Sequence, residues 1–126
     1  MSYYMVLVDI SNGDVIDKLT ILEIKMEKIH DPNDLKHVRR ERRCVYDTAE
    51  PILRQRYIYA YYIHLKDCNT LLWDLENQVR RADITNEFFL QCARSIFEYN
   101  TRRAFLKRQI NTITSSELVE VKQHHC

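Results

Sequence analysis

The feature that most restricts the fold of this chain is its near lack of glycine and proline, with one Gly and two Pro in 126 residues. A β-sandwich or barrel needs a turn about every eight to twelve residues. Many such turns need glycine, which adopts a positive φ without strain. Glycine-rich phosphate loops need at least two glycines, whereas Gly13 stands alone here. The sequence therefore predicts an all-α fold and excludes glycine-rich nucleotide sites.

The length and charge of the chain predict one domain with no general affinity for polyanions. Residues 1–126 are enough for a single hydrophobic core, so we expect one helical domain. The 19 basic and 18 acidic residues give a net charge of +1, which argues against broad nucleic-acid binding. Acids dominate 1–35 and 67–87, whereas bases dominate 36–56 and 94–108. We therefore expect segments of opposite charge to pack side by side, or one face to be positive.

The cysteines and the apolar runs predict a cytoplasmic protein. The four cysteines, Cys44, Cys68, Cys92 and Cys126, are far apart and form no C-x-x-C pair, so we expect reduced thiols. The apolar run 3–8 lacks the preceding basic segment of a signal peptide. No stretch approaches the roughly 18 apolar residues of a transmembrane helix, so no membrane partner is expected.

Apolar residues recur at three-and-four spacing along most of the chain, which is the period of amphipathic helices. Residues with capping chemistry mark the ends of the pattern. Ser11 is a good N-cap for the first helix, and Asp31-Pro32 begins the second. Pro51 is expected to break the chain before the third helix. The predicted helices are 13–29, 32–47, about 50–82 and 86–113.

The unequal lengths of these helices predict how they pack. The economical arrangement is a bundle-like fold in which the two short N-terminal helices lie on a long antiparallel hairpin. The part of the hairpin that they leave uncovered needs a partner, and a homodimer is the simplest one. Residues 1–12 are expected to form an extended arm, with a strand candidate at 3–8, and residues 115–126 a polar tail.

A basic group lies on the predicted second helix and consists of Lys36, Arg39, Arg40, Arg42 and Arg43. Lys36, Arg40 and Arg43 share one helical face, where they could contact successive phosphates of a nucleic acid. Acidic residues are abundant nearby, so we favour a solvated face that pairs with the acidic first helix. Nucleic acid is the least favoured partner.

A polar stripe with three-and-four spacing follows the predicted fourth helix and consists of Asn100, Arg103, Lys107 and Asn111. Arg103 falls within the apolar seam, where a cation needs an acid or a bound anion. The acids that could face it are Asp17, Asp74 and Glu76. Two interpretations stay open. We favour a structural ion-pair network, and the other is a cleft for a small anion that carries a phosphate or carboxylate.

His64 and Cys68 are one helical turn apart, but they do not predict a metal site. A structural metal needs four ligands, and no second pair has the required spacing. The seam is expected to bury the thiol, which disfavours Cys–His catalysis as well. We expect neither a metal nor a cofactor, and we interpret His64 as a core histidine bonded to a neighbour.

The run from Gly13 to Lys25 reads G-D-V-I-D-K-L-T-I-L-E-I-K. It resembles the opening of a family of short, uncharacterised bacterial and phage proteins classed as a domain of unknown function, in which G-E-L-I-D-K-I-T-I-L-E-I-K or a close variant is found. The resemblance continues through L-W-D-L-E at 72–76, A-R-S-I-F at 93–97 and N-x-x-R-A-x-x-K-R-x-I-N at 100–111. Asp14 replaces the usual glutamate. The polar residues that match the family pattern are Asp17, Lys18, Asp74, Glu76, Asn100, Arg103, Lys107 and Asn111.

The resemblance implies no established activity. Some bacterial members are encoded among genes for surface polysaccharide synthesis, which points towards sugar or nucleotide-sugar metabolism. If the helices are antiparallel, the eight matching residues could converge on one cleft.

Three hypotheses on function follow. The leading one is a cytosolic helical oligomerisation or protein-interaction module. The second is a small enzyme or ligand-binding protein, in which Arg103 and Lys107 hold a phosphate or carboxylate and Asp17 or Glu76 acts as acid or base. The third is nucleic-acid binding through the basic second helix. Whether the protein is an enzyme stays open.

Overall fold

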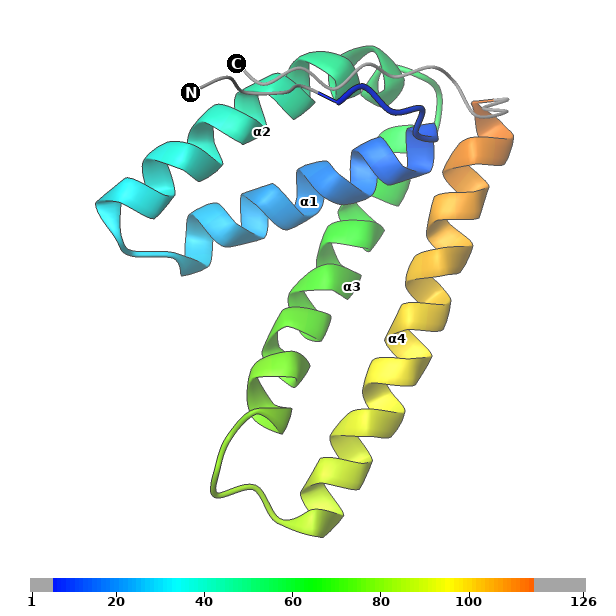
Figure 1. Ribbon diagram of the computed structural model, residues 1–126. Helices are drawn as coiled ribbons and strands as arrows, with labels where there is room; N and C mark the ends of the chain where they lie inside the picture. The colour runs from blue at the N-terminus through cyan, green and yellow to red at the C-terminus, as the bar shows by residue number, and fades with distance from the viewer. Residues whose placement is uncertain (1–5, 115–126) are drawn as a thin grey trace.

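The computed structural model describes residues 6–114, which form four α-helices and no strand within that range. The all-α, four-helix prediction is therefore confirmed. The helices are α1 (Asn12–Lys28), α2 (Pro32–Leu53), α3 (Ile58–Val79) and α4 (Asn86–Ile113), as Figure 1 shows.

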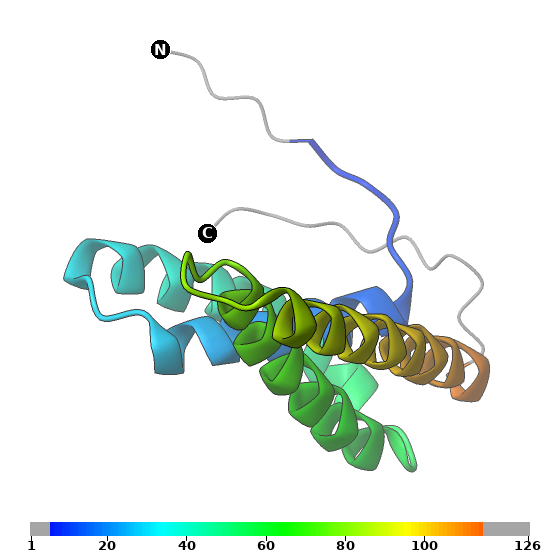
Figure 2. The same cartoon turned by 90° about the horizontal axis from the view of Figure 1, so that it is seen from below.

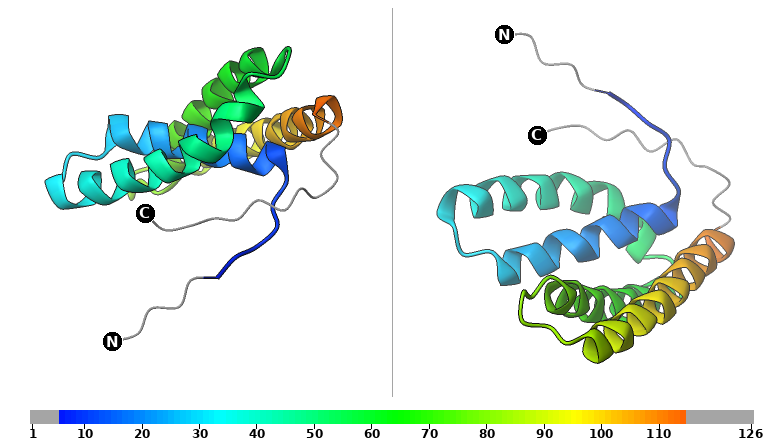
Figure 3. Two further views of the ribbon diagram at one scale, coloured as in Figure 1. Left: turned by 90° about the horizontal axis from the view of Figure 1, so that it is seen from above. Right: turned by 60° about the horizontal axis from the view of Figure 1, so that its bottom comes forward.

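The four helices form two antiparallel hairpins that cross each other. The α1–α2 hairpin lies across one end of the α3–α4 hairpin, and the other end of α3–α4 extends beyond it (Figure 1). Seen from below, the tip of the α3–α4 hairpin lies in front of the α1–α2 hairpin (Figure 2). The right-hand view of Figure 3 shows the two hairpins as separate layers, with α1 as the helix that faces the second layer. The N-terminal pair thus covers only part of the C-terminal hairpin.

The helix starts follow the capping chemistry that the sequence predicts. The Ser11 hydroxyl accepts a hydrogen bond from the Asp14 backbone N–H at 3.2 Å, and the Asp31 carboxylate accepts one from the Asp34 N–H at 3.2 Å. Thr85 caps α4 in the same way. Each cap satisfies a backbone donor that has no partner inside the helix.

The predicted boundary between the second and third helices is wrong. Pro51 lies inside α2, which continues to Leu53, and α3 begins only at Ile58. Pro51 lacks the N–H that would bond the preceding turn. The last turn of α2 nevertheless forms, since it carries Ala49 and Ile52 into the core. Burial of these side chains outweighs the lost hydrogen bond.

A short turn joins α2 to α3 and ends at Tyr57, whose φ of 72° lies in the left-handed region. The third helix is consequently 22 residues long and ends at Val79 rather than near 82, while α2 also has 22 residues. The contrast between two short and two long helices is therefore smaller than predicted.

The core is built around α1, which contacts all three other helices. Five of its apolar side chains are buried, from Val15 to Ile24. They meet residues such as Leu65 of α3 and Ile110 of α4, both fully buried. Burying each such side chain contributes about 1.5–3 kcal/mol. A helix enclosed on several sides needs a broad apolar stripe, and α1 has one.

Predictions for the chain ends and the cysteines have mixed outcomes. Residues 6–8 form no strand, while 1–5 and the predicted tail 115–126 lie outside the described range.

Cys68 and Cys92 are buried free thiols, as expected. Cys44 is disulfide-bonded, so the expectation of a reduced thiol is wrong there. None of the helices within 6–114 has the length and hydropathy to cross a membrane.

Candidate functional site

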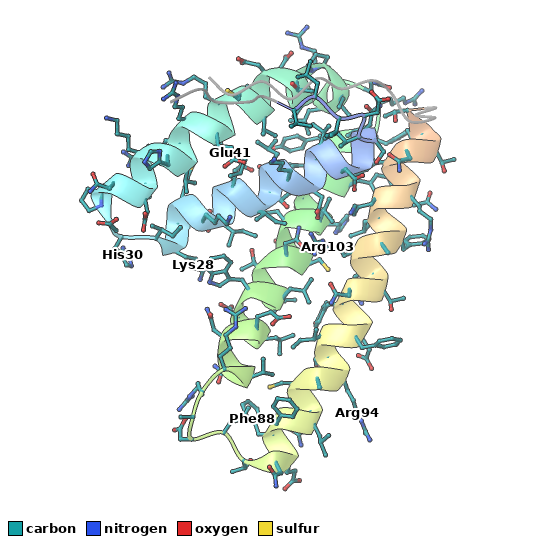
Figure 4. The ribbon with its side chains drawn as sticks, viewed as in Figure 1. Lys28, His30, Glu41, Phe88, Arg94 and Arg103 are labelled. Atoms are coloured by element: carbon teal, nitrogen blue, oxygen red, sulfur yellow. The ribbon has the colours of Figure 1, made fainter. Side chains whose placement is uncertain are left out.

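The most connected polar group lies where α1, α3 and α4 meet, and its centre is Asp17 of α1. Arg103 of α4 points towards α1 and α3 (Figure 4). Its Nε lies 2.8 Å from Asp17 Oδ1 and its Nη2 lies 2.6 Å from Asp17 Oδ2. Only 8% of the Asp17 side chain is exposed. This is a largely buried, two-pronged Arg–carboxylate pair, the geometry in which such pairs are strongest.

Asn69 of α3 completes the environment of the Asp17 carboxylate. Its Nδ2 donates to Asp17 Oδ1 at 2.9 Å and to Thr20 Oγ1 at 2.8 Å. The Thr20 hydroxyl in turn donates to the Asp17 backbone carbonyl at 2.7 Å. All three residues are buried. The carboxylate therefore accepts hydrogen bonds from two helices other than its own.

Lys107 brings a second cation to the same cluster. Its Nζ lies 2.8 Å from Asp14 Oδ1 and 3.9 Å from Asp17 Oδ2. We define the Asp17 cluster as Asp14, Asp17, Thr20, Asn69, Arg103 and Lys107. It contains two carboxylates and two cations, so its formal charge is balanced.

The charges of the cluster act on one another. Partial burial alone would raise the pKa of Asp14, but the Lys107 hydrogen bond and charge and the Ser11 hydrogen bonds outweigh it and hold that pKa below its usual value. The hydrogen bond to Asp17 raises the pKa of Arg103. Both shifts favour the ionised forms, so the cluster is a set of mutually stabilised ion pairs.

Beside the cluster, the N-terminal end of α1 approaches the α4 backbone very closely. The Gly13 N–H donates to Asn111 Oδ1 at 2.7 Å, and Asn12 Nδ2 donates to Thr114 Oγ1 at 3.0 Å. A Cβ at Gly13 would lie only 2.5 Å from the Lys107 carbonyl oxygen. The only glycine of the chain therefore stands where no side chain fits.

Four of the eight predicted cleft residues lie together, namely Asp17, Arg103, Lys107 and Asn111. The other four do not join them. Lys18 pairs with Glu41 of α2 at 3.4 Å, and Asp74 pairs with Lys28 of α1 at 3.8 Å. Asn100 is exposed and Glu76 is half-buried on the part of the hairpin beyond α1.

Sequence reasoning missed Asn69, Thr20 and Asp14 as members of the cluster. Asp14 lies in the first turn of α1, where an acid is favourable at the positive helix end without any other partner. Asn69 follows Cys68 within the seam of the third helix, and a polar side chain beside a buried position is a signal that it has a polar partner. Thr20 carries no such signal in the linear pattern.

The geometry of the Asp17 cluster favours a structural role over a ligand site. Arg103 and Lys107 are already engaged by carboxylates, so an incoming anion would have to displace Asp17 or Asp14. Two open cavities lie elsewhere. One of about 420 Å³ is lined by Tyr57, Tyr61, His64 and neighbours, and one of about 220 Å³ lies at the tip of the α3–α4 hairpin.

The predicted basic group divides into one structural and four exposed residues. Arg42 donates to Glu23 of α1 at 2.9 Å, and the hydroxyl of Tyr62 in α3 donates to the same carboxylate. Burial and the Glu23 charge raise the pKa of Tyr62. The exposed residues, Lys36, Arg39, Arg40 and Arg43, make no ion pair within the described part of the chain. We refer to these four as the basic face of α2.

His64 and Cys68 do not point to a shared ligand. His64 is exposed and lines the larger cavity, so the interpretation as a core histidine is wrong. Cys68 is buried and its thiol donates to the Tyr99 carbonyl oxygen at 3.2 Å. Burial raises the pKa of Cys68, which disfavours the thiolate. Among residues 6–114, no three His, Cys, Asp or Glu side chains are grouped to hold a metal ion.

Fold and polar cluster together define an all-α protein of two crossed helical hairpins joined by a buried ion-pair cluster. The chain belongs to the DUF6165 family, a family of unknown function, whose family model matches residues 6–126. No curated protein and no solved structure matches it.

Proposed function

We propose that this protein is a helical interaction module that self-associates through the outer face of α4. We define this face by Leu90, Ala93, Phe97 and Ala104. Leu90 is 59% exposed and Phe97 is 74% exposed, and Phe97 carries the proposal because it is the most exposed large apolar side chain of the described residues. Exposed apolar residues grouped on one helix face are typical of a protein interface, and on this face Asn100 separates Phe97 from Ala104.

The spacing of the residues supports a helical partner. Leu90, Phe97 and Ala104 are seven residues apart, and Ala93 is three residues after Leu90. Apolar positions at this spacing form the seam of coiled coils. The core-facing side of α4 is separate, since it carries buried Cys92, Leu106 and Ile110. The helix therefore has two apolar faces and only one of them is covered within the chain.

The tip of the α3–α4 hairpin and α3 itself carry further exposed apolar side chains. Phe88 and Phe89 at the start of α4 are 43% and 45% exposed, and Leu71 of α3 is also exposed. The hairpin tip extends beyond α1 and α2 (Figure 1). The Asp17 cluster supports the proposal from the other end, since it fixes α1 on α4 and leaves the outer face open.

The proposal also covers the oligomeric state, the cellular location and the family signature. We propose a homodimer that works in the cytoplasm, with the run from Gly13 to Lys25 as a signature of bacterial and phage members of the family. The small-anion alternative has less support, because both candidate cations of the cluster are paired with carboxylates.

Light scattering at graded protein concentrations tests the proposal. The wild-type chain is expected to have the mass of a dimer at micromolar concentration. Phe97→Asp is expected to give a monomer with unchanged helical circular dichroism, since a charge cannot be buried in an apolar seam without a partner. Ile63→Asp is the matched control, because Ile63 is an exposed apolar residue on a different helix, α3. A wild-type monomer, or a dimer that survives Phe97→Asp, would refute the proposal.

A further inference from the structure

We infer that the partner of the outer face of α4 is a second copy of this chain, whose α4 runs antiparallel with Phe97 level with its own copy. This inference rests on the proposed function and adds the orientation and register of the two helices. It is carried by the charges beside the apolar stripe, which the self-association proposal does not use.

The apolar stripe is compatible with an antiparallel pair centred on Phe97. Leu90 and Ala104 each lie seven residues from Phe97, which is about 10 Å along a helix. An antiparallel pair therefore places Leu90 of one chain level with Ala104 of the other. A large side chain then faces a small one at both ends of the seam, which is how facing helices interdigitate without voids.

The charges on one flank of the stripe fit the same register. Glu87, Arg94, Thr101 and Arg108 are also seven residues apart and are exposed. In an antiparallel coiled-coil pair, this flank of one helix faces the same flank of the other. Glu87 then lies within one residue, about 1.5 Å along the helix axis, of the level of the copy's Arg108, and Arg94 lies equally near the level of the copy's Thr101. The two-fold symmetry produces the Glu–Arg pair twice.

Neither Glu87 nor Arg108 makes an ion pair inside residues 6–114, so both are available for the copy. Arg94, which lies between them on this flank, points away from α3 (Figure 4). The charged flank is thus directed away from the chain's own hairpin partner, as a surface for an external helix must be.

A parallel pair would place like charges together. In a parallel pair, this flank would instead face the other flank of the copy, which carries Phe89, Ile96 and Arg103. Arg108 would then approach the copy's Arg103, and Glu87 would have no cation opposite it. Like charges at such positions destabilise a helix pair, whereas opposite charges select the partner and its orientation. The charge pattern therefore selects the antiparallel arrangement.

A charge exchange between Glu87 and Arg108 tests the register. Glu87→Arg alone and Arg108→Glu alone each replace two attractive pairs by two repulsive ones, so each is expected to raise the dimer dissociation constant about five- to tenfold. The double variant restores both pairs with exchanged sign, and its dissociation constant is expected to return to within about twofold of the wild type. Sedimentation velocity at graded concentrations measures all four constants. Arg94→Glu is the control on the same flank, because Arg94 faces an uncharged residue in this register.

The outcomes separate this inference from the proposed function. If the double variant dimerises as weakly as the single variants while Phe97→Asp still gives a monomer, the register is refuted and self-association through α4 stands. If Arg94→Glu weakens the dimer as much as the two single variants, the proposed flank pairing is refuted. If the wild-type chain is a monomer, both proposals fail, and the outer face of α4 must bind a different protein.

Discussion

At the scale of single residues, Asp17 explains how one carboxylate fixes three helices in place. Its oxygens accept hydrogen bonds from Arg103 of α4 and Asn69 of α3, while its own backbone belongs to α1. A buried carboxylate without partners would be very unfavourable, so any shift of α3 or α4 relative to α1 is penalised. The cluster therefore sets the register of the bundle as well as its stability.

Removing the cation of this pair is expected to destabilise the fold. Arg103→Met keeps the length of the side chain but leaves the Asp17 carboxylate buried without its main partner. We expect the free energy of unfolding to fall by about 3 kcal/mol, measured by urea denaturation. Adding Asp17→Asn is expected to recover part of this loss, because the buried charge is then absent.

Arg102→Met is the matched control, since Arg102 is an exposed neighbour on the same helix whose guanidinium contacts the Tyr99 ring, and it is expected to change stability by less than about 1 kcal/mol. The small-anion hypothesis makes the opposite prediction. If Arg103→Met keeps the wild-type stability and loses measurable binding of inorganic phosphate by calorimetry, the structural interpretation of the cluster is wrong.

The sequence predicts part of this cluster and not the rest, for a physical reason. Periodicity places Arg103 in the apolar seam of its helix, and the need for an acid leads to Asp17. Whether Asn69 faces α1, and whether Asp74 is near or far, depends on the angle at which the hairpins cross. That angle is set by side-chain packing between layers, which no linear pattern contains.

At the scale of elements, the junction between α2 and α3 shows the limit of local signals. Proline is a strong helix breaker within a helix, so Pro51 predicts a boundary. Here Ala49 and Ile52 are buried in the core by the same turn. Because their burial stabilises this turn, the helix continues past Pro51 to Leu53. The chain therefore reverses direction within residues 54–57, where Tyr57 adopts a left-handed backbone conformation.

Relieving this backbone strain is expected to stabilise the protein. Tyr57→Gly removes the steric conflict that a side chain has with a φ of 72°, which amounts to about 1–2 kcal/mol for a non-glycine residue. Little packing is lost, because Tyr57 is 63% exposed. The greater conformational freedom of glycine in the unfolded chain and the lost contact of Arg56 with the Tyr57 ring offset part of this relief. We expect a net gain of about 0.5 kcal/mol in the free energy of unfolding, observable as a higher Tm.

Tyr59→Gly provides the comparison, since Tyr59 is similarly exposed but lies within α3. Glycine inside a helix costs about 1 kcal/mol relative to alanine, so this variant is expected to be less stable than the wild type. Two variants that shift the Tm in the same direction would show that the φ of Tyr57 does not control the effect.

At the scale of the whole molecule, a homodimer partner stays a prediction, and part of the reasoning that led to it is wrong. It was based on two helices of about thirty residues, but only α4, with 28 residues, approaches that length. The uncovered surface arises mainly because the α1–α2 hairpin crosses one end of the α3–α4 hairpin (Figure 1). Phe97 and Ala104 are apolar residues seven apart on α4, yet both are exposed in the structure. Periodicity identifies an apolar position but not which of two faces is covered.

The structure also shows which of the oppositely charged segments of the sequence pack against one another. Acids of α1 pair with the basic segments of α2 and α4, through Glu23–Arg42, Asp14–Lys107 and Asp17–Arg103. Opposite blocks therefore do pack side by side. This leaves the basic face of α2 without acidic partners among the described residues, so the molecule also has one positive surface.

The basic face of α2 is expected to bind polyanions only at low ionic strength. Four phosphate contacts give a salt slope near −3.6, so raising the salt from about 0.02 M to 0.15 M lowers the affinity about a thousandfold. With a net charge of only +1, the remaining surface adds little attraction. We expect retention on heparin at about 0.02 M salt and free passage at about 0.15 M. Arg40→Glu is expected to abolish low-salt retention, whereas Arg54→Glu is the control, because Arg54 already pairs with Glu50. Retention at 0.15 M that Arg40→Glu removes would instead make nucleic acid the favoured partner of this face.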